Sequence, residues 1–167
     1  MSKVAKFVVI INDNVFWMED KAVQFYTNLF EKDLGEKYAE KHLSQKELFR
    51  IQNDFPIEIL MAFLGETPQA YLKLDSSRIL NENLGASKAI NLSEIIYFDE
   101  EDLTALIKRA EEIASQRKHY LVWVKAFPAD TGLIEKLRSL DYKEFDWTES
   151  AEDQFPERIY FRKEMKK

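Results

Sequence analysis

Residues 90–127 read INLSEIIYFDEEDLTALIKRAEEIASQRKHYLVWVKAF, and this stretch decides the fold class. Residues 90–98 and 120–127 are rich in β-branched and aromatic side chains, which is typical of strands. Between them, residues 100–118 place apolar side chains three and four positions apart, the spacing of an amphipathic helix. The stretch therefore predicts a strand, a helix and a second strand, which together make a β-α-β unit.

The N-terminal part predicts a different order of elements. Residues 8–11 predict a first strand, and after the polar turn at residues 12–14 apolar side chains recur at helical spacing up to Phe30. Ser44 and Glu47 have the S-x-x-E spacing of a capping box, in which two side chains satisfy the free backbone donors at a helix start. We therefore expect one strand and then two helices before the middle of the chain.

A hairpin and a loop are expected next. Residues 57–64 and 70–74 are apolar runs separated by the turn sequence GETP, and this arrangement predicts two antiparallel strands. Residues 75–88 have no regular apolar pattern and contain several polar and turn-forming side chains. They are expected to form a loop that leads into the β-α-β unit.

The C-terminal part predicts one more helix and two closing strands. Asp130 is the expected N-cap of that helix, because an aspartate oxygen accepts hydrogen bonds from the free N–H groups of a first turn. Residues 142–147 and 159–165 predict strands, and the polar residues 148–157 predict a surface loop. The predicted fold class is α+β, with helices on both faces of one sheet.

Size and composition favour one folded domain, residues 1–167. The chain has 167 residues, 46% of them hydrophobic, which is enough for one core. Its formal net charge of −6 gives it no general attraction for nucleic acid or for an anionic membrane. No apolar run reaches the length of a membrane-spanning helix or a signal-peptide core, so we expect a cytoplasmic protein without membrane or nucleic-acid partners.

The residue types exclude several kinds of site. The chain has no cysteine, which rules out disulfides, thiolate metal sites and cysteine nucleophiles. With only His42 and His119 available, no metal site is expected, and both histidines are expected to be structural. The four glycines lie too far apart for a P-loop or a G-x-G-x-x-G turn, so nucleotide binding of those kinds is also excluded.

The order of the expected elements, together with short motifs, resembles the GNAT superfamily of N-acetyltransferases. Residues 70–74, AYLKL, are similar to the family's G-Y-L-K-L strand, and residues 92–98, LSEIIYF, are similar to its L-x-E-R-I-Y-V strand. Residues 122–124, VWV, resemble the W-L-x-V strand, and the ending MKK resembles M-x-K. The resemblance spans nearly the whole chain and leans towards polyamine acetyltransferases. It implies the GNAT fold, with a mixed, mostly antiparallel sheet flanked by about four helices, and acetyl-CoA as cofactor.

The resemblance also implies roles for particular residues. Glu94 matches the acidic residue of the L-x-E-R-I-Y-V strand, where a carboxylate acts directly or through water as the base that deprotonates an incoming ammonium. An ordinary strand glutamate is the alternative reading. The residues that it implies for cofactor binding are Ile96, Tyr97, Phe98, Leu103 and Thr104. The first three would present backbone groups to the pantetheine arm; their alternative role is in the core and in strand pairing.

A slot between two strands is a further expectation from the resemblance. In the family, the strand that ends here at Phe98 and the strand at residues 120–127 begin side by side and then diverge, which leaves a V-shaped slot for the thioester arm. We expect the slot to be present, with Tyr97 and Phe98 on one wall and residues 123–127 on the other.

The chain departs from the family's pattern at the cofactor loop. The Q/R-x-x-G-x-G/A loop, whose bare N–H groups bind a pyrophosphate at a helix N-terminus, is missing. Residues 99–102, DEED, stand in its place, and their carboxylates would satisfy the helix donors and repel a pyrophosphate. The family's tyrosine acid falls at or near Leu137, and the asparagine that touches the cofactor is lost.

Two functions therefore stay open. The first is an acetyl-CoA-dependent N-acetyltransferase with a shortened cofactor loop, which acts on a small primary amine such as a polyamine with Glu94 as base. The second is a non-catalytic GNAT-fold module, a pseudoenzyme that binds a partner or a ligand lacking a pyrophosphate. Homodimers recur in the family, so a homodimer is expected by analogy.

Overall fold

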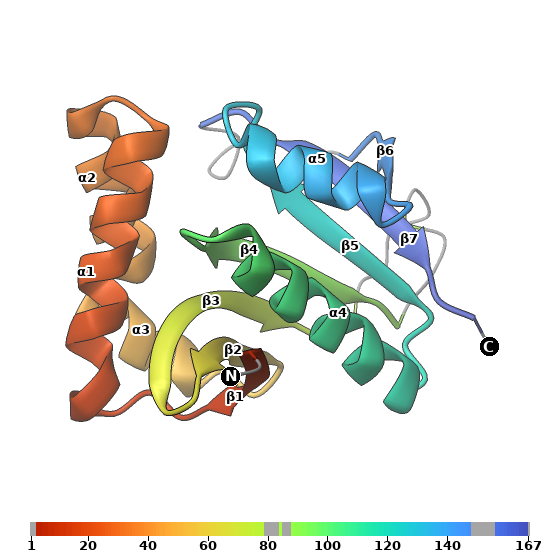
Figure 1. The fold of residues 1–167 in the computed structure, drawn as a ribbon, viewed down its shortest axis with the longest axis horizontal. Helices are drawn as coiled ribbons and strands as arrows, with labels where there is room; N and C mark the ends of the chain where they lie inside the picture. The colour runs from red at the N-terminus through yellow and green to blue at the C-terminus, as the bar shows by residue number, and fades with distance from the viewer. Residues whose placement is uncertain (1–2, 79–83, 85–87, 148–155, 167) are drawn as a thin grey trace.

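The computed structural model describes residues 3–78, 84, 88–147 and 156–166 (Figure 1). Its strands form one seven-stranded sheet in the order β1-β2-β3-β4-β5-β7-β6 within the described residues. In that part of the chain β4 and β5 pair in parallel, and the other neighbouring strands pair antiparallel, so the expected mixed, mostly antiparallel sheet is confirmed. The strands are β1 (Lys3–Val8), β2 (Ile57–Leu64), β3 (Thr67–Asp75), β4 (Ile90–Ile96), β5 (Leu121–Ala126), β6 (Lys143–Phe145) and β7 (Ile159–Glu164).

Five helices lie on the two faces of this sheet in the described part of the chain (Figure 1). They are α1 (Asn12–Leu29), α2 (Lys32–Leu43), α3 (Gln45–Gln52), α4 (Glu100–Gln116) and α5 (Thr131–Ser139). Strand β2 shows how both faces are covered: Ile59 and Met61 pack against α1–α3, whereas Leu60 and Ala62 pack on the side of α4 and α5. Burial on both faces explains why β2 is a continuous apolar run. None of the described helices is both long and apolar enough to cross a lipid bilayer.

The first strand lies earlier than the sequence predicts. The β-branched residues 8–11 predict a strand, but β1 is Lys3–Val8 and pairs with β2 along its whole length. Ile10 is instead buried among the helices of the α1–α3 face, and Ile11 is the N-cap of α1. Pairing with β2 at the sheet edge, rather than local strand propensity, sets the position of β1.

Helix α2 is the element that the sequence analysis does not predict. It has few apolar residues and contains Gly35, which lowers intrinsic helix propensity. The structure explains the glycine, because a Cβ at Gly35 would lie 2.4 Å from the Tyr26 carbonyl oxygen and 2.6 Å from Thr27 Cα. Gly35 therefore lets α2 pack directly against the backbone of α1. This close approach depends on tertiary structure and leaves no local pattern.

The other expected elements are confirmed with small shifts at their ends. Asp130 caps α5 as predicted, with its Oδ1 accepting a hydrogen bond of 3.2 Å from the Leu133 N–H. Ser44 caps α3, and its hydroxyl accepts from the Glu47 N–H over 3.3 Å. Much of the two expected loops, at residues 79–83, 85–87 and 148–155, lies outside the described residues.

Candidate active site

Strands β4 and β5 diverge as expected. Their parallel pairing runs only from Ile90 and Val122 to Leu92 and Val124. Beyond these residues β4 continues to Ile96 and β5 continues to Ala126 without pairing to each other (Figure 1). The predicted separation of the two strand ends is therefore confirmed.

A cavity of about 290 Å³ lies at the end of β4, and we call it the mouth cavity. Tyr97 and Phe98, which directly follow β4, line it as predicted, and Phe25 lines it from α1. The prediction for the opposite wall is wrong, because that wall is formed by residues 129–132 at the start of α5. Successive side chains of β5 point to alternate faces of the sheet, and the chain then turns back into α5, so the β5 side chains pack elsewhere.

The two aromatic residues expected on that wall are both in hydrophobic clusters. Trp123 packs against Trp147 with ring centroids 4.6 Å apart. Phe127 reaches the rings of α1 and α2, with 5.0 Å to Phe30 and 5.2 Å to Tyr38. Phe127 thus fills the space between the diverging strands and the helices α1 and α2. Both Trp123 and Phe127 are packing residues.

Tyr97 bridges the mouth cavity from β4 to α5. Its hydroxyl donates a hydrogen bond of 2.5 Å to Asp130 Oδ1, the same oxygen that caps α5. Burial raises the pKa of Tyr97, and the hydrogen bond to Asp130 raises it further, so the hydroxyl stays protonated. Burial likewise raises the pKa of Asp130. Gly132 leaves room for this hydroxyl, because a Cβ there would lie only 2.6 Å from it.

A second cavity, of about 350 Å³, lies between α4 and α5, and we call it the helix cavity. It shares Tyr97 and Gly132 with the mouth cavity, so the two adjoin. Leu103 lines it, and an ion pair of 2.7 Å between Lys136 and Glu100 joins its two helices. Of the five residues expected to bind the cofactor, Tyr97, Phe98 and Leu103 therefore face a cavity.

The remaining two expected cofactor residues have structural contacts. Ile96 is fully buried in the core on the α1–α3 face and pairs with Tyr71 of β3. The Thr104 hydroxyl donates to the carbonyl of Glu100 one turn earlier, over 3.0 Å. Their side chains are therefore not brought to either cavity.

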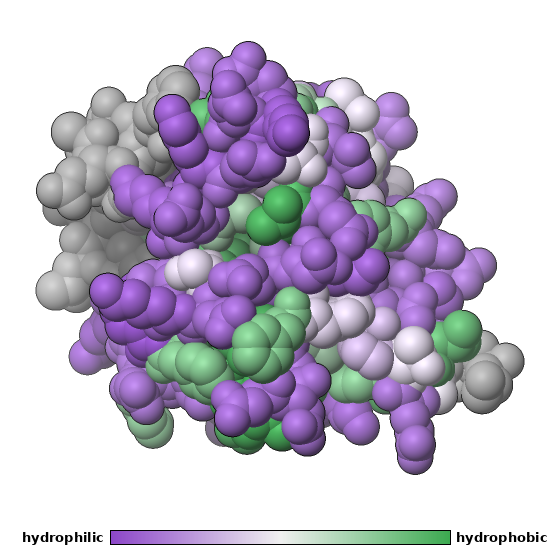
Figure 2. All heavy atoms as spheres, turned by 90° about the vertical axis from the view of Figure 1, so that its left-hand side faces the viewer, coloured by the Kyte–Doolittle hydropathy of each residue, from purple (hydrophilic) through white to green (hydrophobic). Residues whose placement is uncertain are grey.

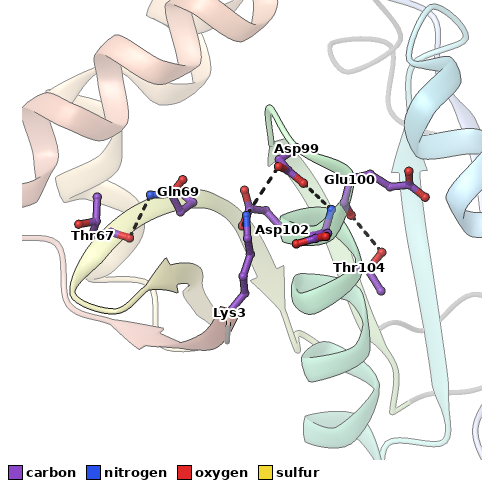
Figure 3. A network of polar contacts seen from close by, with 8 residues as sticks. Lys3, Thr67, Gln69, Asp99, Glu100, Asp102 and Thr104 are labelled. Atoms are coloured by element: carbon purple, nitrogen blue, oxygen red, sulfur yellow. Dashed lines mark hydrogen bonds and ion pairs between the residues drawn. The ribbon is translucent and has the colours of Figure 1, made fainter. Parts of the chain in front are cut away.

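The N-terminus of α4 is capped by Asp99 and is rich in acidic residues (Figure 3). The Asp99 carboxylate accepts the Glu101 N–H over 2.7 Å. Lys3 lies between two carboxylates, 2.9 Å from Asp102 and 3.7 Å from Asp99 (Figure 3). The residues present therefore fit the slim pantetheine arm of an acyl-CoA along the two cavities, but they do not offer a cradle for its diphosphate.

Glu94 lies in a bulge of β4. The pairing with β3 shifts between Tyr71 and Lys73, and Glu94 has a positive φ of 49°. This extra residue places Leu92 and Ile95 on the α4 face, so Glu94 points towards α1 and α2. A non-glycine residue in this conformation costs about 1 kcal/mol, which the contacts of the carboxylate offset.

The Glu94 carboxylate is held by Tyr26, Tyr38 and Arg158, which come from three distant segments of the chain. We call Glu94 and these three residues the Glu94 cluster. The Tyr26 hydroxyl donates to Oε2 over 2.8 Å, and the Tyr38 hydroxyl donates to Oε1 over 2.6 Å. The Arg158 guanidinium lies 4.0 Å from Oε1 and donates to the Tyr38 hydroxyl over 2.9 Å. Both carboxylate oxygens are therefore engaged by tyrosines.

Electrostatics keeps the Glu94 cluster in defined protonation states. Burial raises the pKa of Glu94, but Lys73, His42, Arg158 and the Tyr38 hydrogen bond outweigh it and leave the pKa below its usual value. Burial raises the pKa of both tyrosines well above their usual value, and the Glu94 charge raises it further. The Glu94 carboxylate is therefore ionised, and the Tyr26 and Tyr38 hydroxyls that donate to it are neutral.

Sequence reasoning singles out Glu94 but not its partners. Tyr26 and Tyr38 are 68 and 56 positions away along the chain, and Tyr26 also fits the apolar spacing of α1. Arg158 lies between the expected loop at residues 148–157 and the expected last strand at residues 159–165, where no motif marks it. The ring of His42 packs against that of Tyr38, with the two ring centroids 4.3 Å apart. The described residues hold no group of three acidic or histidine side chains suited to a metal ion.

Comparison with known proteins finds similarity in structure only. No protein-family model matches the chain, and no curated protein sequence matches it. Among solved structures, PaiA N-acetyltransferase from Thermoplasma acidophilum in complex with coenzyme A is similar with a TM-score of 0.71 and 14% identity, over 98% of this chain and 99% of that chain. An N-acetyltransferase from Staphylococcus aureus Mu50 is similar with a TM-score of 0.65 and 10% identity, over 98% of both chains. Aminoglycoside 6′-acetyltransferase type Ii is similar with a TM-score of 0.58 and 11% identity, over 96% of both chains. The chain therefore has the fold of the GNAT acetyltransferases.

Proposed function

Starting from the GNAT fold, we propose that this protein transfers an acyl group, in the first instance acetyl, from an acyl-CoA to a small primary amine. The observation that carries the proposal is the divergence of β4 and β5, with a cavity at the open end of β4. Paired strands would leave no space for a thioester between them. Phe25 and Tyr26 are neighbours on α1, and they connect the mouth cavity to the Glu94 cluster.

The two cavities give a route for the pantetheine arm. The arm would lie along Leu103 and Tyr97, and its activated thioester would supply the carbonyl carbon that an amine attacks. In that reaction a C–N bond forms, the C–S bond breaks, and the ammonium must lose a proton before the attack. The departing thiolate would take its proton from solvent, because the Tyr97 hydroxyl beside the mouth cavity already donates its proton to Asp130 and burial raises its pKa.

In this proposal the Glu94 cluster accepts the proton of the amine. Both Glu94 oxygens already accept hydrogen bonds, so a proton reaches the carboxylate through the Tyr38 hydroxyl rather than directly. An amine that displaces the Arg158 guanidinium from the Tyr38 oxygen, and donates to that oxygen in its place, would complete a relay from nitrogen to Tyr38 to Glu94. The acceptor is a small amine, with polyamines as the first compounds to test because the chain resembles polyamine acetyltransferases.

A second function is favoured by the N-terminus of α4. There the Asp99 cap, the Lys3 ion pairs and the Lys136–Glu100 pair replace a diphosphate cradle. These contacts support a non-catalytic module of the same fold whose ligand lacks a diphosphate. Such a module would use the mouth cavity without the coenzyme.

Calorimetric titration separates the two functions. Acetyl-CoA and CoA are titrated into the protein, and acetyl transfer to spermidine, spermine and shorter diamines is then measured across pH. The proposed enzyme binds acetyl-CoA and acetylates at least one amine faster as pH rises, since more amine is unprotonated. Glu94→Gln should abolish that transfer, with the surface variant Glu112→Gln as control. Absence of both binding and transfer would leave the non-catalytic module.

Two further expectations come from the sequence and belong with this proposal. A homodimer is proposed by analogy to the family, together with a cytoplasmic location. Sedimentation equilibrium gives the mass of the assembled protein and tests the homodimer directly. Fractionation of cells tests the location.

A further inference from the structure

Arg158 is a buried cation in the centre of the Glu94 cluster. Its side chain is only 6% exposed, although arginine is normally a surface residue. The guanidinium carbon lies 5.3 Å from the centre of the Phe127 ring and 6.0 Å from that of Tyr38. One nitrogen donates to the Tyr38 hydroxyl over 2.9 Å. The cation therefore has aromatic rings, a hydroxyl and the Glu94 carboxylate around it.

The contact between Arg158 and Glu94 is loose for a buried ion pair. The nearest nitrogen is 4.0 Å from Glu94 Oε1, and the Tyr38 hydroxyl bonds to both groups. In the same chain Arg117 binds Glu58 with two hydrogen bonds, of 2.7 Å and 3.1 Å, the fork geometry typical of arginine and a carboxylate. The position of the Glu94 carboxylate is held mainly by the hydrogen bonds from Tyr26 and Tyr38. Arg158 therefore lies beside the carboxylate but is not the group that fixes its position.

We propose that Glu94, Tyr38 and Phe127 form a cation-binding cage for alkylguanidinium or primary alkylammonium groups, which Arg158 fills as a built-in occupant. Aromatic faces with an adjacent carboxylate bind such cations by cation–π attraction, charge and hydrogen bonding together. The cage lies beneath α1 and α2, whose outer face is mainly hydrophilic (Figure 2). Its assignment as the subsite for the acceptor amine rests on the proposed function; its capacity to bind a cation does not.

The cage has consequences for the occupied protein. While Arg158 is in place, a free amine cannot reach the Tyr38 hydroxyl, because that hydroxyl and both rings already contact the guanidinium. Arg158 thus competes with the ligand, and removing its side chain opens a space of the shape and charge of the missing group. A free cation that refills this space should restore stability.

The experiment replaces Arg158 by alanine and supplies the missing group from solution. Ethylguanidinium contains the atoms that Arg158→Ala removes beyond Cβ. The variant should melt at a lower temperature than the unmodified protein, and ethylguanidinium at millimolar concentration should raise its Tm again by about 3 °C or more. Propylammonium should also raise it. The unmodified protein should show no such rise, because its cage is filled.

Three controls make the result specific. N-ethylurea has nearly the same shape without charge and should not raise the Tm of Arg158→Ala. Arg162→Ala removes another arginine of this chain segment, one that bonds to the Leu84 carbonyl and not to the cage, and should not respond to ethylguanidinium. The double variant Arg158→Ala/Glu94→Gln removes both charges and should fold without responding.

Each result decides for or against the cage. Recovery by ethylguanidinium in Arg158→Ala alone supports it. Equal recovery with N-ethylurea, recovery in the double variant, or no recovery at all overturns it. Failure of Arg158→Ala to fold even when refolded with ethylguanidinium, while the double variant folds, overturns it as well. The melting assay contains no acyl donor, so failure of acetyl transfer leaves its result unaffected and the two proposals fail separately.

Discussion

The Tyr38 hydroxyl donates a hydrogen bond of 2.6 Å to Glu94 Oε1 and so ties helix α2 to the bulge of strand β4. The same hydroxyl accepts from Arg158, and the opposite carboxylate oxygen accepts from Tyr26. One buried carboxylate thus connects α1, α2, β4 and the residue before β7. These elements should lose stability together when it is changed.

Glu94→Gln should lower the free energy of unfolding by about 2–4 kcal/mol, because it leaves buried cationic and hydroxyl groups without their anion. Urea denaturation measures the change as a lower midpoint with an unchanged slope. Glu112→Gln, which removes an exposed carboxylate paired with Arg109, should change it by less than about 1 kcal/mol. Equal effects of the two variants would contradict the role given to Glu94.

His42 should make stability depend on pH below about 7. Burial lowers its pKa below the unfolded value of about 6.5, so the unfolded chain binds a proton more readily than the folded one. The free energy of unfolding is therefore complete above about pH 6.5 and falls as pH decreases towards the folded pKa. His42→Phe keeps a ring against Tyr38 and should flatten this dependence in urea titrations. Identical slopes in both proteins would refute the assignment.

Gly35→Ala should destabilise the protein by about 1–3 kcal/mol or more, despite the better helix propensity of alanine. The new Cβ would collide with the backbone of α1, at the Tyr26 oxygen and Thr27 Cα, and backbone cannot easily move aside. Gly132→Ala is the matched control, because its Cβ meets the end of the Tyr97 side chain, which can rotate. Thermal melting should show the larger loss for Gly35→Ala; the reverse order would be evidence against it.

Replacing Glu100 and Glu101 by glutamine should tighten acetyl-CoA binding by about three- to tenfold at low salt. The change removes two carboxylates at the N-terminus of α4 and releases Lys136 from its pair with Glu100. Calorimetry at two salt concentrations tests this, and the gain should shrink as salt rises. Glu112→Gln removes a charge from the other end of α4 and should leave the affinity unchanged. A gain that is independent of salt would exclude the electrostatic explanation.

Much of the fold follows from local patterns in the sequence. The β-α-β unit at β4, α4 and β5 was predictable because apolar spacing reports which face of an element is buried. Helix starts were predictable at Ser44 and Asp130, since capping depends on side chains within one turn. The acidic start of α4 was also predictable, because Asp99 bonds only two residues ahead.

The tertiary structure alone decided what joins distant segments. The position of β1 depends on its pairing with β2, and α2 depends on the Gly35 contact with α1. The wall of the mouth cavity depends on how the chain turns after β5, which apolar periodicity does not record.

The same division holds for the candidate site. The sequence by itself determined that Glu94, Tyr97 and Phe98 lie at the end of a central strand and that α4 begins without a glycine loop. The partners Tyr26, Tyr38 and Arg158 were decided only by folding. A bulge turns Glu94 towards α1 and α2, and hydrogen bonds between side chains far apart in the chain hold it there. Such contacts depend on distance in space, so no local sequence pattern encodes them.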